Sequence, residues 1–326
     1  MFGDSLSDSG YQNLLPYKQG WPDIPDTATP KSATFTTPGG KVWGEHLESL
    51  LGRVVSTNNT NKIPTTSTAS GNLSGNNYAA GGATTTCTGI TVSASGNIIY
   101  SPPPIGPLRT GETCPDPSIQ QYNQIDNYLT SNSNQADPTA IYILWGGANN
   151  IFIAQASTPS EVAQKTISAA KDMTHDVEYL YQHGARKFII LNLPNLGLAP
   201  GETNNGQIDV NESAQTIAEV YNTTLNSELA TIQSNYPEIQ YQIIDTFNLL
   251  NDIVQNFEIT SFNVKYTFVN TKQSACSFSP ATSAISCIPA SQKLQGYVFE
   301  DGVHPATAAH KIISDYIYTA IEKLAE

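Results

Sequence analysis

The stretch AIYILWGG, at residues 140–147, is a continuous apolar run that ends in two glycines. A short run of this kind predicts a strand buried on both faces, which is typical of a parallel sheet covered by helices. The segment that follows, residues 158–184, has apolar residues at helical spacing. Thr158 or Ser160 is a candidate N-cap, and Gly184 lies just past the expected end. The sequence therefore predicts a buried strand followed by a long helix.

The same alternation continues to the C-terminus. The segments, in order, are a buried strand (KFIILNLPN, 187–195), a long helix at about 211–235, a third strand (IQYQIID, 239–245), a short helix, and a closing amphipathic helix with Pro305 near its first turn (304–325). Strands separated by helices imply right-handed parallel crossovers and a sheet covered on both faces. We therefore predict an α/β fold, a doubly wound and mostly parallel sheet flanked by helices.

Two long segments differ from this alternation. Residues 54–138 are rich in Ser, Thr, Asn, Gly and Pro, and residues 259–299 form a similar segment just before the sequence EDGVHP. Each is interpreted either as a surface insertion or as an excursion that shapes the mouth of a site. We expect one domain over residues 1–326 that carries these two insertions, because the sequence has no internal repeat and no linker between separate cores.

The chain is acidic: 15 Lys and Arg residues against 28 Asp and Glu residues give a formal net charge of −13. Such a surface lacks the positive field that a phosphate backbone requires, which argues against nucleic acid as a partner. Anionic membranes would not attract it by charge, and no stretch approaches the roughly 20 apolar residues of a membrane span. No motif indicates a cofactor or an obligate protein partner.

The four cysteines, Cys87, Cys114, Cys276 and Cys287, are even in number and lie in turn-rich segments. In a chain rich in Ser, Thr and Asn this indicates two disulfides and an oxidising compartment. Three pairings are open, of which we favour the nearest-neighbour one, 87–114 and 276–287. A metal site is disfavoured because no CxxC or Cys/His spacing suits zinc. We expect a secreted protein whose leader, with part of a first strand, precedes the sequence given.

The N-terminal stretch FGDSLSDSG places Ser5 between a Gly-Asp turn and the expected start of a helix. At the carboxyl end of a parallel strand, a serine is exposed where ligands bind in such folds. The helix N-terminus can also supply an N–H group to a developing oxyanion. The alternative is that Ser5 only caps a helix. A GDS tripeptide occurs by chance in roughly one in ten chains of this length, so the motif alone decides nothing.

Three further motifs supply what a nucleophilic serine requires. The motif DGVHP places Asp301 and His304 three residues apart, so that the His can act as base while the Asp fixes its tautomer. The stretch NNYAAGGAT (76–84) has glycines where a backbone amide must approach a ligand. The stretch WGGANN (145–150) offers the Asn149 side-chain amide to an oxyanion. Each motif alone is more simply a turn or a helix cap, but all occur in order at strand ends of one sheet.

Together these residues resemble the conserved blocks of the GDSL (SGNH) hydrolase family: GDSL at 3–6, the block that ends in Gly82, GxN at 147–149 and DxxH at 301–304. The resemblance implies Ser5 as nucleophile, His304 as base and acid, and Asp301 as the residue that orients the His. It also implies a flavodoxin-like three-layer sandwich. The implied oxyanion hole consists of the Ser5 and Gly82 N–H groups and the Asn149 side chain.

Three stretches, FTTPGGKVWGEHL (35–47), NNYAAGGAT and LPNLGLAP (193–200), resemble the secreted bacterial branch of lipases, phospholipases A and glycerophospholipid:cholesterol acyltransferases. Asn150 and Asn195 depart from that branch, which usually has Asp at both positions. Neither is a triad position, so the departures put in question only the fine positioning around Asn149.

The resemblance implies hydrolysis of lipid acyl esters, as by a lysophospholipase, phospholipase A or lipase, with acyl transfer to a sterol when water is excluded. The implied partner is a lipid or other ester substrate, with transient contact at a lipid surface. The same motifs serve carbohydrate O-deacetylation, and a non-catalytic binding module would usually have lost the serine or the histidine. Aromatic side chains near the motifs are candidates for an acyl groove: Tyr11, Trp21, Phe35, Trp43 and Phe152.

The loop between Cys276 and Cys287 lies just upstream of the Asp301–His304 pair. It is interpreted either as a lid or cleavable restraint on access to the site, or as a plain structural staple, and both interpretations stay open.

The remaining histidines are expected to have no catalytic role. We expect His183 at a helix C-terminus, where a cation suits the helix dipole, and His310 at a polar position of the last helix. His46 and His175 fall in helical patterns as surface or core residues.

Overall fold

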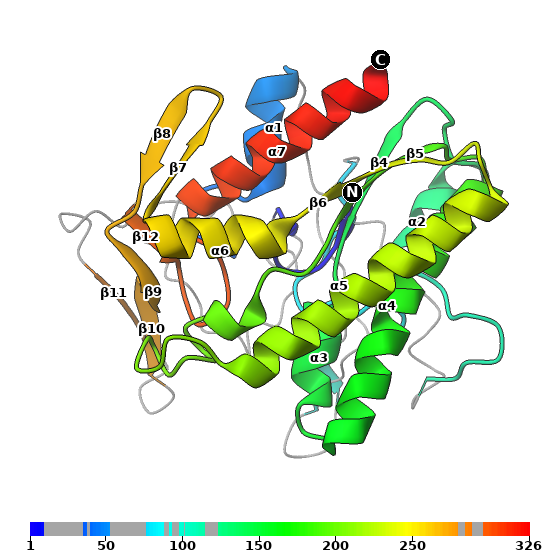
Figure 1. Ribbon diagram of the computed structural model, residues 1–326. Helices are drawn as coiled ribbons and strands as arrows, with labels where there is room; N and C mark the ends of the chain where they lie inside the picture. Colours follow the sequence, from blue (N-terminus) through cyan, green and yellow to red (C-terminus); the bar gives the residue numbers. More distant parts are fainter. Residues whose placement is uncertain are drawn as a thin grey trace.

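A parallel sheet with the strand order β1–β4–β5–β6 forms the centre of the molecule (Figure 1). Its strands are β1 (Phe2–Gly3), β4 (Ile141–Trp145), β5 (Lys187–Leu191) and β6 (Gln240–Ile244). The structure is a computed structural model that describes residues 1–9, 35–37, 40–52, 76–87, 91–92, 98–100, 102–114, 123–279, 284–288 and 296–326.

Side chains of the central strands alternate between two apolar clusters. In β4, Tyr142 and Leu144 belong to one cluster, while Ile143 and Trp145 belong to the other. This follows from the two-residue period of a strand, in which neighbouring side chains point to opposite faces. All four side chains are buried, so the prediction of a strand buried on both faces is confirmed.

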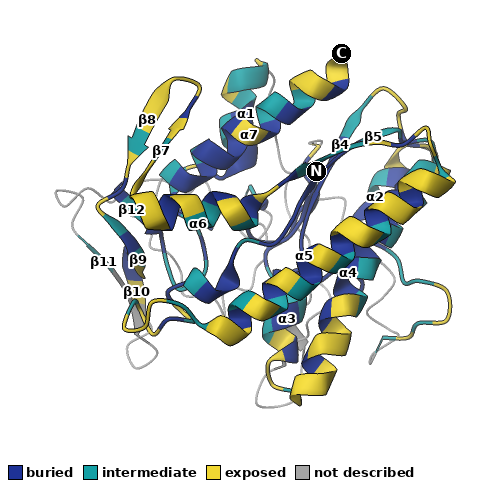
Figure 2. Cartoon of the chain, viewed as in Figure 1, coloured by how far each residue is buried: buried dark blue, intermediate teal, exposed yellow. Residues whose placement is uncertain are grey.

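Helices cover both faces of the sheet and turn their buried sides toward it (Figure 2). One face carries α2 (Gln124–Ser131), α3 (Ala148–Ala154), α4 (Pro159–Gln182) and α5 (Glu212–Asn235). The other carries α1 (Trp43–Leu51), α6 (Thr246–Asn256) and α7 (Thr307–Ala325). The predicted three-layer α/β architecture is therefore present.

The ends of α4 follow the residues predicted to cap it. Thr158 is the N-cap, and its backbone N–H and its hydroxyl donate to the Glu161 carboxylate at 2.8 and 2.7 Å. Gly184 follows the helix with φ +117°, a left-handed value that favours glycine. Local sequence therefore fixes both boundaries of this helix.

The start of α7 differs from the prediction. The helix begins at Thr307, so His304 and Pro305, the first residues of the predicted helical segment, lie before it. Pro305 instead forms an antiparallel bridge with Phe299, and the Ala306 N–H donates to the Val298 carbonyl at 2.8 Å. Pairing with the preceding strand keeps this segment extended, and His304 consequently sits in a turn outside the helix.

The predicted insertions contribute to the core as well as to the surface. From the first, Tyr78, Ile105 and Ile125 are buried in the cluster under α4 and α5. The strands in and beside the two segments are β2 (Thr91–Val92), β3 (Ile98–Tyr100), β7 (Glu258–Ser261), β8 (Val264–Thr267), β9 (Asn270–Ser274), β10 (Cys276–Ser279), β11 (Ala284–Cys287) and β12 (Tyr297–Phe299). A single domain with insertions at 54–138 and 259–299 stays a prediction.

Both favoured disulfides are present in the structure. Cys87 and Cys114 are joined with an S–S distance of 2.03 Å. Cys276 and Cys287 are register partners on β10 and β11, and their disulfide closes the base of that hairpin. Residues 280–283, at the centre of the suggested lid, lie outside the described residues, so the lid hypothesis is not tested.

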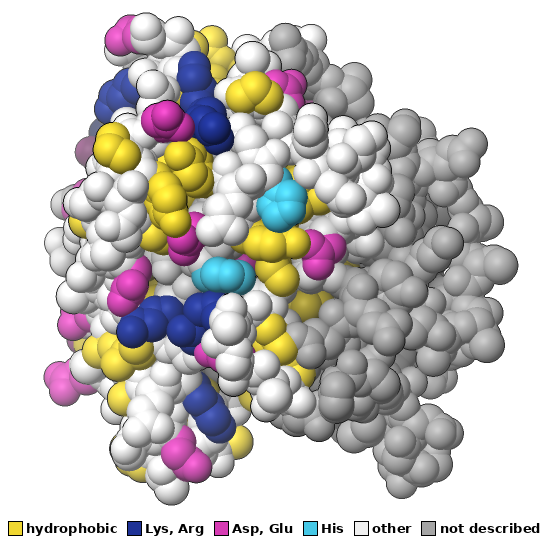
Figure 3. Space-filling view, turned by 90° about the vertical axis from the view of Figure 1, so that its right-hand side faces the viewer, with side chains coloured by type: hydrophobic (Ala, Val, Ile, Leu, Met, Phe, Trp, Pro, Cys, Tyr) yellow, Lys and Arg dark blue, Asp and Glu magenta, His cyan; other side chains and the backbone are white. Residues whose placement is uncertain are grey.

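The charge distribution on the surface and the apolar character of the helices relate to two expectations, namely that nucleic acid is not a partner and that no segment spans a membrane. On the face shown in Figure 3, Lys and Arg side chains lie in small groups interspersed with Asp and Glu. Among the helices of the described ranges, none is long and apolar enough to cross a bilayer. The exclusion of nucleic acid stays a prediction from the net charge.

Candidate active site

Ser5 lies in a turn directly after β1, at the carboxyl end of the strand that forms one edge of the described parallel sheet. The Ser7 and Asp8 N–H groups both donate to the Asp4 carbonyl, at 3.1 and 3.0 Å, which closes the turn around Ser5. A Cβ on Gly3 would lie 2.5 Å from the Trp145 carbonyl oxygen. Only glycine fits there, so the strand approaches β4 closely and delivers Ser5 to the edge of the sheet.

His304 and Asp301 form a hydrogen-bonded chain with Ser5. The His304 Nε2 atom lies 2.8 Å from Ser5 Oγ, and its Nδ1 atom lies 2.7 Å from Asp301 Oδ2. The second carboxylate oxygen of Asp301 accepts the N–H groups of Val303 and His304, each at 2.8 Å. Because the carboxylate can only accept, Nδ1 carries a proton and the neutral ring presents its Nε2 lone pair to Ser5.

The two ionisable partners shift each other's pKa. Burial by itself would lower the pKa of His304, but the charge of Asp301 and the hydrogen bond to it outweigh burial, and the pKa is raised. Burial would raise the pKa of Asp301, but the charge of His304 and three hydrogen bonds outweigh it, and that pKa is lowered. The pair is therefore held as an ionised carboxylate beside a basic imidazole.

Two buried residues, Phe35 and Glu300, contact His304 in ways that the sequence did not predict. The Phe35 ring lies 5.0 Å from the His304 ring, centroid to centroid. The Glu300 N–H donates to the His304 carbonyl at 2.8 Å. Burial raises the pKa of Glu300 to about 7, with the Thr37 hydroxyl acting in the opposite direction. A carboxyl group that titrates near neutrality therefore lies next to Asp301.

The glycine-containing loop at 79–83 lies against the Ser5 turn. The Ala80 N–H donates to the Gly3 carbonyl at 3.0 Å, and the Gly81 N–H donates to Asp8 Oδ2 at 2.8 Å. Gly82 has φ +80°, so a non-glycine residue would be strained there. Over the described ranges of the chain, no hydrogen bond uses the backbone N–H of Ser5 or of Gly82.

Asn149 belongs to the first turn of α3 and faces the same loop. Its Nδ2 atom donates to the Ala83 carbonyl at 2.9 Å, which leaves the second amide hydrogen for another acceptor. The N-cap of α3 is Gly147, with φ +110°, and a Cβ there would lie 2.5 Å from the Tyr221 ring. The glycine lets α3 begin tightly against α5 and sets the position of Asn149.

An apolar cavity of about 130 Å³ opens beside Ser5 and His304 and continues between the sheet and helices α6 and α7. Its walls include Trp145, Leu249, Ile253, Phe299 and Ile313. Its volume and lining suit a hydrocarbon chain better than a sugar, whose hydroxyls would find few partners.

Of the aromatic residues considered for an acyl groove, Phe152 lines this cavity. Phe35 packs on His304 instead. Trp43 belongs to the core, where its indole N–H donates to Ser7 Oγ at 3.1 Å. Tyr11 and Trp21 lie outside the described residues.

Gln124 supports the site in a way that sequence reasoning missed. Its side chain is fully buried and pairs with the backbone of Gly3, accepting its N–H and donating to its carbonyl, both at 2.8 Å. Gln124 thus satisfies the edge of β1 as a neighbouring strand would. A single glutamine in a polar segment carries no pattern that would predict this role.

The remaining histidines stand apart from the hydrogen-bonded chain. His183 is the C-cap of α4, as expected. The expectation for His310 is wrong, because its side chain is completely buried, and burial lowers its pKa to about 3. His46 is half-buried on α1, with Nε2 3.0 Å from the Thr307 hydroxyl.

One group of residues has the spacing of metal ligands within the described ranges, namely Cys276, Cys287 and Glu300. The two sulfur atoms are joined in a disulfide and are not thiolates. Cysteine binds metals as the thiolate, so this cluster does not fit a metal while the two cysteines are joined in a disulfide.

A parallel α/β sheet with a Ser–His–Asp chain at its carboxyl edge is an arrangement on which serine ester hydrolases are built. The chain belongs to the GDSL-like lipase/acylhydrolase family, whose family model matches residues 1–317. The family resemblance drawn from the four motifs is thereby confirmed.

Individual relatives are distant. A GDSL esterase/lipase of Arabidopsis thaliana is 28% identical over 223 residues, which are 63% of this chain and 60% of that protein. Another from the same plant is 25% identical over 340 residues, which cover 98% of this chain and 86% of the relative. A Pseudomonas putida protein from the trpE-trpG intergenic region is 26% identical over 98% of this chain and 48% of its own length. The bacterial branch suggested by the sequence is not confirmed.

Among solved structures, that of a possible lipase from Chitinophaga pinensis DSM 2588 matches 60% of this chain and 77% of its own at 12% identity. Its TM-score of 0.29 is too low to support any statement about the site.

Proposed function

We propose that this protein is a serine ester hydrolase in which Ser5 is the nucleophile, His304 the base and acid, and Asp301 the residue that orients the imidazole. The proposal rests above all on the continuous hydrogen-bonded chain from Ser5 Oγ through His304 to Asp301 at the mouth of an apolar cavity. Family membership supports ester hydrolysis as the reaction.

In the proposed reaction, the Ser5 hydroxyl proton passes to His304 Nε2 as Ser5 Oγ attacks the ester carbonyl. The imidazolium then gives its proton to the leaving alcohol, and an acyl-enzyme remains. Water repeats the sequence with His304 again as base and releases the carboxylic acid. Asp301 stays ionised throughout and stabilises the imidazolium, in keeping with its lowered pKa.

The proposed oxyanion hole consists of the Ser5 N–H, the Gly82 N–H and the Asn149 side chain. The two backbone groups make no hydrogen bond within the part of the chain that the structure describes. Asn149 has one amide hydrogen beyond the one that it donates to Ala83. Three such donors would hold the tetrahedral oxyanion more strongly than the planar carbonyl.

We propose lipid acyl esters as the substrate class, because the cavity beside Ser5 is lined mainly by aliphatic and aromatic side chains. Secretion is part of the proposal, since the two disulfides suit an oxidising compartment.

Whether a sterol can replace water as acyl acceptor is tested by adding cholesterol to the lipid assay and measuring cholesteryl ester. Carbohydrate O-deacetylation is the rival activity.

Two measurements test this proposal. A fluorophosphonate probe should label the wild-type protein and fail to label Ser5→Ala, whereas equal labelling of both would remove Ser5 as the nucleophile. A series of p-nitrophenyl esters from acetyl to palmitoyl should give the highest kcat/KM with a medium or long chain. A clear preference for acetyl would instead favour the carbohydrate esterase.

A further inference from the structure

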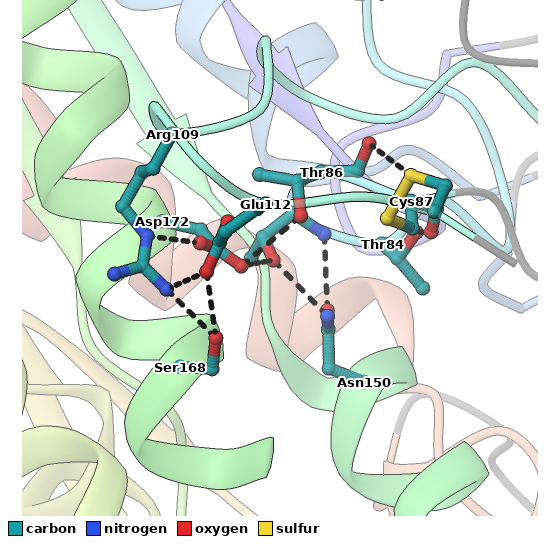
Figure 4. The surroundings of a disulfide bond; sticks show 10 residues. Thr84, Thr86, Cys87, Arg109, Glu112, Asn150, Ser168 and Asp172 are labelled. Atoms are coloured by element: carbon teal, nitrogen blue, oxygen red, sulfur yellow. Dashed lines mark hydrogen bonds and ion pairs between the residues drawn. A yellow bond between two sulfur atoms is a disulfide. The ribbon is translucent and has the colours of Figure 1, made fainter. Parts of the chain in front are cut away.

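A polar network joins the N-terminal turn of α3 to the loop at 84–87 (Figure 4). Asn150 Oδ1 accepts the Thr85 N–H, and Asn150 Nδ2 donates to Thr85 Oγ1, both at 3.0 Å. The Thr85 hydroxyl in turn donates to Asp172 Oδ2 on α4 at 2.9 Å. A single threonine is therefore held by its backbone and its side chain between two helices.

Asp172 is the fixed end of this network. Its side chain is buried, and besides Thr85 it accepts the Thr86 hydroxyl at 3.1 Å and Arg109 Nε at 2.7 Å. Arg109 is itself held by Ser168, whose hydroxyl accepts from Nη2 at 2.8 Å, and by an ion pair with Glu112. A buried carboxylate with this many donors has little freedom to move.

Backbone and covalent links hold the same loop from its other side. The Ile105 and Gly106 N–H groups donate to the Thr84 and Thr85 carbonyls at 3.0 and 2.9 Å. The disulfide between Cys87 and Cys114 ends the loop, as Figure 4 shows. The loop is thus also anchored to residues 105–106 and, through the disulfide, to Cys114.

The anchored loop at 84–87 follows closely after Gly82 of the proposed oxyanion hole. Gly82 precedes it by two positions, and the Ala83 carbonyl accepts the hydrogen bond that orients Asn149. We propose that Asn150 and Asp172 are positioning residues of the oxyanion hole, which act through Thr85 on both Gly82 and Asn149. This inference rests on the proposed function of the site.

The direction of the hydrogen bonds explains why an amide stands at position 150. Thr85 has one hydroxyl proton, and it goes to Asp172, so the hydroxyl can only accept from residue 150. A carboxylate at position 150 would have no proton to donate and would compete with Asp172 for that of Thr85. It would also bring a further negative charge close to Asp172.

The test is a pair of substitutions that reverses this direction. In Asn150→Asp, kcat on p-nitrophenyl butyrate should fall about 10²-fold with little change in KM, because a displaced donor weakens the transition state rather than binding. Asp172→Asn alone should also lower kcat. The double variant N150D/D172N should recover most of the loss, since the amide introduced at position 172 can then donate to the Thr85 hydroxyl while the carboxylate introduced at position 150 accepts its proton.

Asn211→Asp is the matched control. Asn211 caps α5 and has the same kind of partners, because its Oδ1 accepts the Ala214 N–H and its Nδ2 donates to the Glu202 carboxylate. The kcat of the Asn211→Asp variant should equal that of the wild type. An alkylboronic acid, which forms a tetrahedral adduct on Ser5, should lose affinity in N150D in proportion to kcat/KM and regain it in the double variant.

The outcomes separate this inference from the proposed function. Loss of activity in Ser5→Ala with a wild-type kcat in folded N150D would overturn the positioning role and leave the serine mechanism intact. A kcat loss in N150D that the double variant does not recover, at equal thermal stability, would also overturn it. Full activity in Ser5→Ala would instead overturn the proposed function itself.

Discussion

On one side of Ser5, the proposed base and its carboxylate lie three residues apart in one turn, with a hydrogen bond of 2.7 Å between them. On the other side, the proposed oxyanion donors come from three segments that are distant in the sequence, at Ser5, Gly82 and Asn149. The first half needs only the geometry of a short turn. The second half needs the loop at 79–87 to be placed against both the Ser5 turn and α3.

We call Asp301 and His304 the base half of the site, and Ser5 N–H, Gly82 and Asn149 the oxyanion half. Each half has its own buried carboxyl group and its own disulfide nearby. Glu300 and the Cys276–Cys287 disulfide lie beside the base half, where the Cys276 N–H donates to the Glu300 carbonyl at 2.7 Å. Asp172 and the Cys87–Cys114 disulfide lie beside the oxyanion half. A half that is local in sequence should tolerate the loss of its distant supports better than a half assembled from separate loops.

The largest expected effect comes from breaking the base half at Asp301. In Asp301→Asn, the Oδ1 atom can keep the N–H groups of Val303 and His304, so the amide nitrogen faces His304 Nδ1. This favours the tautomer with the proton on Nε2, which cannot accept the Ser5 proton. We expect kcat to fall about 10⁴-fold. Steady-state assays on p-nitrophenyl butyrate check this, and a loss under about tenfold would contradict the orienting role.

Breaking the oxyanion half at Asn149 should have a smaller effect. Asn149→Ala removes one of three proposed donors, and kcat should fall about 10²–10³-fold. KM should change little, because the donor acts on the tetrahedral state. Near-normal turnover in a folded variant, judged by circular dichroism and thermal melting, would exclude Asn149 from the oxyanion hole.

Removing each disulfide should lower the stability of the protein, but only one removal should also lower its activity. Cys87 and Cys114 are separated by 27 residues, and Cys276 and Cys287 by 11. Loop-closure entropy predicts that replacing the first pair by alanines lowers the free energy of unfolding by about 3–4 kcal/mol, and replacing the second by about 3 kcal/mol. Urea denaturation measures both. Only replacement of Cys87 and Cys114 should also lower kcat, because that disulfide anchors the loop beside the oxyanion donors. A larger loss of kcat on replacing Cys276 and Cys287 would show that the base half, and not the oxyanion half, depends on its disulfide.

The smallest expected effect concerns pH. His304 must be neutral to accept the Ser5 proton, and its pKa is raised above the ordinary value, so kcat/KM should fall as the pH drops below a pKa above about 6.5. The negative charge of Glu300 contributes to that raised pKa. Glu300→Gln removes the charge that Glu300 carries above its own pKa of about 7, so the acid limb should move to lower pH by less than about one unit. An unchanged limb, or one moved upward, would show that Glu300 has no electrostatic effect on His304.

Several elements could be predicted from the sequence because their causes are local. The buried runs at 140–147 and 187–195 correspond to the central strands β4 and β5, since continuous apolar side chains can be satisfied only on a strand covered on both faces. The hydrogen bonds that cap the start of α4, and the one between Asp301 and His304, each join residues no more than four positions apart. Sequence separations of 27 and 11 residues favour the nearest-neighbour disulfides among the three possible pairings but do not exclude the other two.

Other features could not be predicted because their partners are distant in the sequence. Gln124 is 121 residues from the Gly3 backbone that it satisfies. Thr85 and Asp172 are 87 residues apart. His310 occupies what looks like a polar position of a helix, but α1 and the segment around Phe35 pack over it and bury it.

By itself, the sequence determined the layered α/β fold, the family and the residue types that can perform acyl transfer, because hydrophobic periodicity and short motifs record local physical requirements. The tertiary structure decided how those residues meet. It brought Ser5 to His304 across 299 residues, opened an apolar cavity beside them, and joined Asn150 through Thr85 to a buried carboxylate. Such contacts depend on burial and hydrogen-bond direction in the folded state, and no window of neighbouring residues contains them.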